Sequence, residues 1–449
     1  MTHVFPRVLD RELPEAVAAE GVWITAADGR RFLDGAGGAV VVNVGHGHRG
    51  VVAAIESQLA RTQYVHGTMF TTGALEDYAD EVASVLPIDD ARIYPVSGGS
   101  EAVETALKLA RAFHLARGER SRFVVIGRRG AYHGNTLGAL DASGKEPLRK
   151  PYTPWLGRFL HAPPAYEYRC ESTRHPHACG EWHAAELDRM IAQAQPASIA
   201  AFIAEPVAGA TLGAAVPCED YWSSVVEVCR RHGVLVIADE VMTGFGRTGK
   251  NFAYQHSPGV TPDLMVLGKG MVSAALPAGG LVMSREITAV MDRYRWETVA
   301  TFAGNPIVSA AIAANVEWLI EERIADRAAV LGEHLGLRLR ELQERHPCVA
   351  RIDGAGLLWA VELVRPDGSG ERFVAEDRHL IPTGTGGFSP SLFIAAECAR
   401  QGVALATAPP NTLRLGPPLT TTSENIDLGI AGLDAALAAL DRVGVPVAS

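Results

Sequence analysis

The chain has 449 residues, of which 47% are hydrophobic and 20% charged, a composition typical of a folded globular protein and not of a disordered one. Its formal net charge of -10 at pH 7 disfavours nucleic acid and anionic membranes as partners. No apolar run is long enough to span a bilayer, and the first residues carry Asp10, Glu12 and Glu15 in place of a signal-peptide core. We therefore expect a soluble, cytoplasmic protein.

Short apolar runs alternate along the chain with segments of helical periodicity. A hairpin is predicted first, with strands at residues 21–25 and 31–33 around a polar turn. The runs predicted as buried strands are residues 123–126, 199–204, 234–238, 264–267 and 280–283. The helices predicted between them are residues 100–116, 184–195 and 220–232. This alternation predicts an α/β fold with a mostly parallel sheet and helices on both of its faces.

The length exceeds what a single compact core accommodates, which predicts more than one domain. After about residue 325 a long helical pattern leads to an apolar stretch at 349–364 and then to a polar, glycine-rich loop at 366–390. We predict a large domain over residues 56–325 and a smaller α+β domain built from both termini, residues 1–55 and 326–449.

A charged residue follows each of three predicted strands: Glu205 and Asp239 directly, and Lys269 after one glycine. Ligands of open parallel sheets bind beyond the carboxyl ends of the strands, so these side chains are expected at one site. Lys269 lies between two glycines, and desolvation there would lower its pKa and make the neutral amine a nucleophile. Taken alone, this lysine is equally well explained as a surface residue at a strand end.

Asp239 requires a partner, because an unpaired charge at a buried strand end is costly. A protonated pyridine nitrogen would serve, and so would one of the many arginines. Residues 97–101, Ser-Gly-Gly-Ser-Glu, lead into the predicted helix, where amide groups, the Ser100 hydroxyl and the helix terminus suit a phosphate. Tyr132 follows the strand at 123–126, and its ring could stack on a flat cofactor or belong to the core.

These motifs resemble, in the same order, those of the class III (ω-amino acid type) aminotransferases, which use pyridoxal 5'-phosphate (PLP) and have PLP fold type I. The resemblance covers nearly the whole chain and makes the large domain the PLP-binding domain. The matching segments are residues 21–34, 43–46, 97–102, 106–111, 132–134, 205–207, 239–241, 244–249, 268–270, 301–306 and 413–419.

The resemblance also implies roles for individual residues. Lys269 would be the Schiff-base lysine that shuttles a proton, and Asp239 would pair with the pyridine nitrogen. Arg414 matches the arginine that binds a substrate carboxylate. The other implied cofactor contacts are Gly99 and Ser100 at the phosphate, Tyr132 and Val241 on the two faces of the ring, His133 and Glu205, and Thr301 from a second subunit. The contact from Thr301 implies a homodimer with the active site at the interface.

Two departures from the family pattern bear on the acceptor. Ala210 and Met242 stand where members that use 2-oxoglutarate often carry glutamate and glutamine, which resembles the branch that transfers ω-amino groups to pyruvate. Val40 stands where that branch often has tryptophan, and a smaller residue could admit a bulkier donor. We predict a transaminase that moves an amino group from an amine or ω-amino acid to a 2-oxo acid, pyruvate, by a ping-pong mechanism through Lys269.

Two other functions remain open. A PLP-dependent lyase, decarboxylase or epimerase on the same fold would use the same cofactor site, and so would a PLP-binding protein that has lost catalysis. One cluster lies outside the family motifs: Cys170, His175, His177, Cys179 and His183 crowd into fourteen residues. Their spacings match no common zinc-ligand pattern, so we expect a polar surface segment and no metal site.

Overall fold

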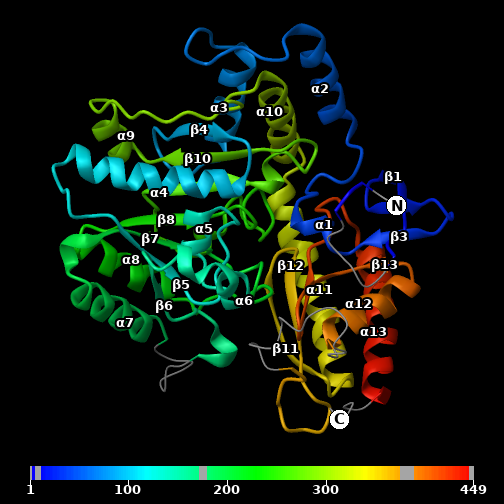
Figure 1. Ribbon diagram of the computed structural model, residues 1–449. Coiled ribbons are helices and arrows are strands. Elements are labelled where there is room, and N and C mark those ends of the chain that lie inside the picture. The colour runs from blue at the N-terminus through cyan, green and yellow to red at the C-terminus, as the bar shows by residue number, and fades with distance from the viewer. Residues whose placement is uncertain (1–2, 6–11, 171–178, 375–388, 444–449) are drawn as a thin grey trace.

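A seven-stranded sheet is the central element of the computed structural model, which describes residues 3–5, 12–170, 179–374 and 389–443 (Figure 1). In spatial order its strands are β4 (Arg92–Val96), β10 (Gly279–Met283), β9 (Leu264–Gly268), β8 (Leu235–Asp239), β7 (Ile199–Ala204), β5 (Val124–Arg128) and β6 (Leu160–Ala162). The strands from β9 to β6 are parallel, and β10 is antiparallel to both of its neighbours. The predicted mostly parallel sheet is therefore confirmed.

Helices cover both faces of this sheet, which explains why its central strands are apolar throughout. Helix α4 (Gly99–Ala116) lies on one face, and α7 (Cys179–Gln193) and α8 (Tyr221–Arg231) lie on the other (Figure 1). Alternate residues of β7 pack against the helices on the two faces of the sheet. Ile203 packs in the cluster formed with α4, whereas Phe202 packs in the cluster formed with α7 and α8.

Most of the predicted elements are present, with small shifts at their ends. Strand β7 has the predicted bounds, and the predicted hairpin is formed by the antiparallel strands β2 (Trp23–Ala26) and β3 (Arg31–Asp34). Helix α7 begins at Cys179, five residues before the predicted start at residue 184. Its early start has a tertiary cause, because the Asp220 carboxylate accepts a hydrogen bond from the Gly180 amide at 3.2 Å.

Two four-stranded sheets form the other side of the molecule. One contains, in order, β1 (Ala16–Glu20), β2, β3 and β13 (Val403–Ala404), and the parallel pairing of β13 with β3 joins the N- and C-terminal parts of the chain. The other contains β11 (Val349–Ala355), β12 (Leu358–Leu363), β15 (Thr412–Leu415) and β14 (Ala406–Ala408). The predicted apolar stretch at 349–364 is thus the hairpin β11–β12.

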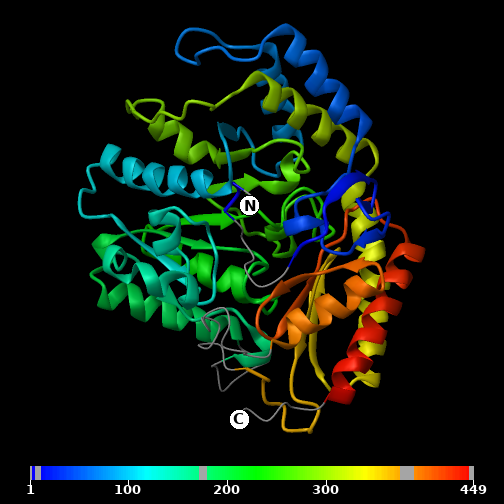
Figure 2. The same ribbon diagram turned by 45° about the vertical axis from the view of Figure 1, so that its right-hand side comes forward.

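Long helices complete both parts. Figure 2 shows α11 (Ile324–Arg345), α12 (Pro390–Arg400) and α13 (Ser423–Val443) beside the β11–β12 hairpin. Helices α2 (Arg49–Arg61) and α3 (Gly73–Ser84) pack against α10 (Pro306–Glu321). The remaining helices are α1 (Gly37–Val40), α5 (Leu137–Ala142), α6 (Glu146–Arg149), α9 (Arg285–Met291), and the 3-10 helices η1 (Lys150–Trp155), η2 (Glu167–Arg169), η3 (Pro196–Ser198), η4 (Ala253–His256) and η5 (Lys269–Met271).

The predicted domain boundaries remain predictions. Residue 55 lies within α2, and residue 325 lies at the start of α11. Most of the predicted loop at 366–390 lies outside the described residues, as do His175 and His177. Within the described ranges, no helix is both long enough and apolar enough to cross a membrane.

Candidate active site

Lys269 stands at the carboxyl end of β9, in a backbone conformation that few residues adopt. The strand ends at Gly268, and Lys269 begins η5 with a φ of 46°. A positive φ is uncommon in residues other than glycine, and such strain clusters at functional sites. The glycine that follows is required by packing, since a Cβ on Gly270 would lie 2.2 Å from Nδ2 of Asn43.

The surroundings of Lys269 favour its neutral amine. Burial is the largest cause and, together with the nearby Arg414 guanidinium, lowers the pKa of Lys269 to about 8, although Asp239 and Glu205 act in the opposite direction. A substantial fraction of this amine is therefore uncharged near pH 8 and able to act as a nucleophile. The four charged groups interact electrostatically, so the structure brings together the three strand-end residues and Arg414.

Asp239 is buried at the end of β8 and is held by both carboxylate oxygens. Its Oδ2 lies 2.6 Å from Nδ1 of His133, and its Oδ1 accepts a hydrogen bond from the Val241 amide at 3.1 Å. Among the described residues its ion-pair partner is thus a histidine and not an arginine. A carboxylate fixed in this way can stabilise a protonated pyridine nitrogen.

Glu205 directly follows β7 and is also buried. Arg128 donates a hydrogen bond to its carbonyl oxygen, and one guanidinium nitrogen of Arg128 lies 3.8 Å from its carboxylate. Burial raises the pKa of Glu205 to about 7; the charges of His133 and Arg128 lower it, and Asp239 raises it further. Glu205 is therefore partly protonated near neutral pH. Arg128 was not predicted as a site residue, and its position at the end of β5 is the feature that could have indicated it.

The predicted phosphate site lies at the start of α4. The helix begins without a side-chain cap at Gly98, so its first amide groups are available to an anion. The Ser100 hydroxyl lies 3.2 Å from both the amide and the side-chain oxygen of Asn135, a residue that we had not singled out. This contact depends on Gly134, because a Cβ there would lie 2.5 Å from Oγ of Ser100.

Arg414 reaches the site from β15 in the other part of the molecule. Its Nη1 lies 3.2 Å from the carbonyl oxygen of Gly209 and 3.5 Å from that of Ala210. It is buried, which lowers its pKa to about 10, and its Nε has no hydrogen-bond partner in the described part of the chain. Met242 is close by, since a Cβ on Gly209 would lie 2.1 Å from its Sδ. Of the two departures from the family pattern, Ala210 thus contacts Arg414 through its carbonyl, and Met242 lies beside the neighbouring Gly209.

In the part of the chain that the structure describes, two predicted site residues have no contact with this cluster that tests their predicted roles. Thr301 lies on an exposed turn before α10, and no hydrogen bond within the described residues links it to Ser100. Val40 is 1% exposed and packs in an apolar cluster with Leu358 and Met242. Its contact with a substrate therefore stays a prediction.

The two residues predicted to flank the cofactor ring, Tyr132 and Val241, are both partly buried. The Tyr132 amide hydrogen-bonds Glu205, and Val241 packs against Gly99.

The residues present fit PLP. A partly neutral lysine, a fixed carboxylate and an uncapped helix start meet at the carboxyl edge of a mainly parallel sheet, and these groups suit the aldehyde, the pyridine nitrogen and the phosphate of the cofactor. The fold and the site thus define a PLP-dependent enzyme of fold type I.

Comparisons with known proteins identify the family. A family model described as aminotransferase class-III matches residues 10–437. The putrescine–pyruvate aminotransferase of Pseudomonas aeruginosa is 32% identical and aligns over 91% of this chain and 87% of its own. The chain belongs to the class III aminotransferases, which are PLP-dependent.

Solved structures agree with this assignment. A thermostable (S)-enantioselective ω-transaminase from Thermomicrobium roseum superposes with a TM-score of 0.89 at 32% identity, covering 98% of this chain and 96% of that one. An amine transaminase from an uncultivated Pseudomonas species, in its PLP-bound form, gives a TM-score of 0.90 at 32% identity over 98% and 99% of the two chains. The predicted family, fold class, enzyme class and cofactor are confirmed.

Proposed function

We propose that this transaminase moves an amino group from an amine or ω-amino acid to pyruvate in two stages, with the first product leaving before the acceptor binds. The observation that carries the proposal is Arg414. Its buried guanidinium hydrogen-bonds two backbone carbonyls and forms no salt bridge to an acidic side chain within the described residues. A substrate carboxylate is the partner that such a group lacks.

Pyruvate is proposed as the acceptor because it carries fewer carboxylates than 2-oxoglutarate. Pyruvate carries one carboxylate, which one arginine can bind in a bidentate manner. 2-Oxoglutarate carries a second carboxylate, and the family members that use it often carry glutamate and glutamine where this chain has Ala210 and Met242. Among relatives, the putrescine–pyruvate aminotransferase is named for this acceptor.

The catalytic roles follow from the same geometry. PLP, when bound, supplies an electron sink that weakens the bond between carbon and hydrogen in the donor. Lys269 Nζ takes that proton and returns it, which its lowered pKa permits. Asp239 would keep the ring nitrogen protonated, and the amide of Gly99 and the hydroxyl of Ser100 would hold the phosphate. Tyr132 and Val241 would contact the ring, while His133 holds the Asp239 carboxylate and Glu205 lies close enough to both to affect their charges.

The two half-reactions test this function separately. With putrescine or an ω-amino acid and no acceptor, holoenzyme is expected to release about one equivalent of carbonyl product per active site and to lose its visible absorption. Pyruvate should then restore the absorption and yield alanine. Arg414→Ala should weaken the apparent affinity for pyruvate by about 10- to 150-fold, because a charge-assisted contact is lost.

The putrescine step is the internal control, since this donor has no carboxylate. Its apparent affinity for Arg414→Ala should stay at the wild-type value, and only the pH profile of the step should move to higher pH, because loss of the guanidinium raises the pKa of Lys269. Product that keeps accumulating without an acceptor would identify a lyase or decarboxylase instead. Equal or better turnover with 2-oxoglutarate would contradict the assignment of pyruvate.

A homodimer is part of the proposal. Apolar side chains gather on two exposed segments, residues 64–70 and 299–302, where Val299 is 88%, Met69 72% and Phe302 60% exposed. The two segments touch, since the rings of Tyr64 and Phe302 have centroids 6.5 Å apart. Exposed apolar surface of this kind marks an interface. Thr301 lies within it, which supports its reaching the phosphate site of a partner subunit.

Mixed dimers test this arrangement. We expect Lys269→Ala and Thr301→Asp to be inactive separately, the second because a negative charge would face the phosphate. After subunit exchange at equal concentrations, half of the dimers are mixed and one of their two sites is intact, so about a quarter of the wild-type activity should return. Failure of activity to return although mixed dimers are seen by native mass spectrometry would place Thr301 at its own subunit's site or at none.

A further inference from the structure

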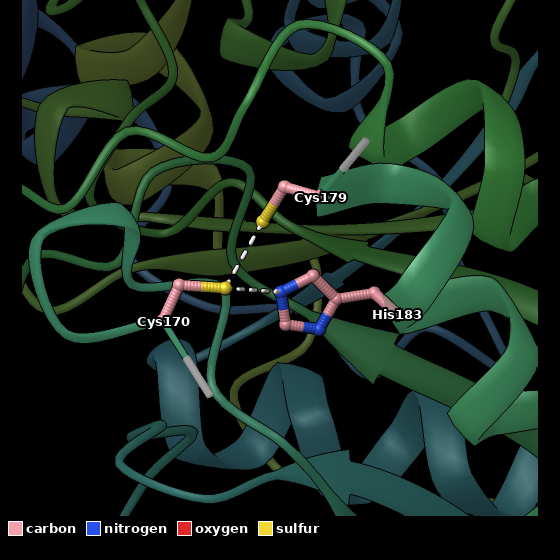
Figure 3. Close-up of side chains that lie close together, drawn as sticks. All are labelled: Cys170, Cys179 and His183. Carbon is pink, nitrogen blue, oxygen red and sulfur yellow. Dashed lines mark hydrogen bonds between the residues drawn. The ribbon is translucent and has the colours of Figure 1, made fainter. Parts of the chain in front are cut away.

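Three potential metal ligands meet on the face of the sheet away from α4 (Figure 3). Sγ of Cys170 lies 3.2 Å from Sγ of Cys179 and 4.0 Å from Nε2 of His183, and the three ligand atoms lie within 4.8 Å of one another. Cys179 is 2% and His183 4% exposed. The expectation of a polar surface segment is therefore wrong for these two residues.

The arrangement follows from the local fold. Cys179 and His183 are four residues apart at the start of α7, so their side chains project from one face of that helix. Cys170 approaches from the segment that follows η2. Because the first residues of α7 are held by Asp220, the neighbouring Cys218 is brought to the same place, where it hydrogen-bonds Cys179. Cys218 could not be predicted as a member of this cluster from the spacing within residues 170–183, because it lies outside that segment.

We propose that Cys170, Cys179, His183 and Cys218 form a structural Zn²⁺ site. Three thiolates and one imidazole are a common zinc ligand set, and a closed tetrahedral shell without an open position favours a structural role. Soft sulfur ligands select zinc over magnesium or calcium. Each coordinating thiol gives up its proton to solvent, and the imidazole binds as the neutral base.

The distances fit a metal better than a disulfide. Tetrahedral zinc with ordinary bond lengths places two sulfurs about 3.8 Å apart and a sulfur and a nitrogen about 3.6 Å apart. The two observed distances fall within about 0.6 Å of these values, whereas a disulfide needs about 2.05 Å between sulfurs.

Zinc here would fix a segment that touches the other part of the molecule. Immediately before Cys170, Arg169 forms a salt bridge of 2.9 Å to Glu362 on β12, and Tyr166 hydrogen-bonds the same carboxylate. A metal that ties Cys170 to α7 would therefore anchor the contact between the central sheet and the β11–β12 hairpin. The site would stabilise the fold and would take no part in the transfer chemistry.

The test measures metal in untagged holoenzyme purified without chelators or metal columns. We expect about one zinc ion per chain by inductively coupled plasma mass spectrometry, and Co²⁺ in its place should show the intense visible bands of tetrahedral thiolate coordination. Cys170→Ser and His183→Ala should each lower the zinc content at least about tenfold and lower the melting temperature. Cys229→Ser is the matched control, because this buried cysteine of α8 lies outside the cluster.

Each other outcome overturns the proposal. Zinc-free protein that takes up no Co²⁺ would exclude the site, and four titratable thiols in denaturant in place of six would identify a disulfide. Zinc that is unchanged in both Cys170→Ser and His183→Ala would lie elsewhere. Because Cys170 is only partly buried, Cys170→Ser keeps the test decisive even if substitution of the buried His183 prevents folding.

Discussion

Lys269→Ala is expected to lower kcat by at least about 10³-fold and to leave the fold intact. The amine of Lys269, with its pKa lowered to about 8, is the proton carrier of the proposed mechanism, and Asp239 and Glu205 cannot replace it because they are held by their own partners. The fold should survive because alanine and lysine meet the same strain at a φ of 46°, and the change removes a buried charge.

The measurement is steady-state kcat together with thermal unfolding of the PLP-loaded protein. Lys250→Ala is the matched control, since Lys250 is exposed and follows a glycine-rich turn away from the strand ends. We expect wild-type kcat in the control. Full turnover by Lys269→Ala would show that the proton carrier has been assigned incorrectly. If Lys269→Ala does not fold, kcat is measured for Lys269→Arg, which keeps the charge and the length of lysine but not its nucleophile.

Asp239→Asn is expected to reduce kcat by about 10²- to 10³-fold while PLP still binds. Asparagine can keep an acceptor for the Val241 amide, so the side chain should stay in place. It carries no negative charge, however, and the protonated pyridine nitrogen that draws electrons from the donor would lose its counter-charge. The effect should therefore appear in kcat and in the absorption spectrum more than in the affinity for PLP, which the phosphate contacts also support.

Asp263→Asn separates this electrostatic role from the general effect of changing an aspartate in the sheet. Asp263 accepts the Val236 amide at 2.7 Å and lies just before β9, at the opposite edge of the sheet from Lys269. We expect this control to lose stability but to keep its kcat. If both variants lost kcat to the same extent, or if Asp239→Asn kept it, the pairing of Asp239 with the pyridine nitrogen would be refuted.

The pattern of apolar residues was enough to predict the inner strands of the central sheet and the edge at which its charged side chains meet. Buried parallel strands must be apolar on both faces, so β7, β8 and β9 were recognisable as uninterrupted apolar runs. Because all three run in the same direction, the charged residues that follow them, Glu205, Asp239 and Lys269, must meet at one edge. Nothing beyond short-range pattern and strand direction was needed.

The distant groups that complete the sites became evident from the packing of the chain and not from its sequence. Arg414 lies about two hundred residues from the Gly209 carbonyl that it contacts, and Cys218 is far in sequence from Cys170. Glycines such as Gly134 permit close contacts, here with the Ser100 hydroxyl, that cannot be predicted from the sequence. The physical reason is that hydrophobic periodicity specifies which face of an element is buried, whereas the partner of that face depends on how all the elements pack together.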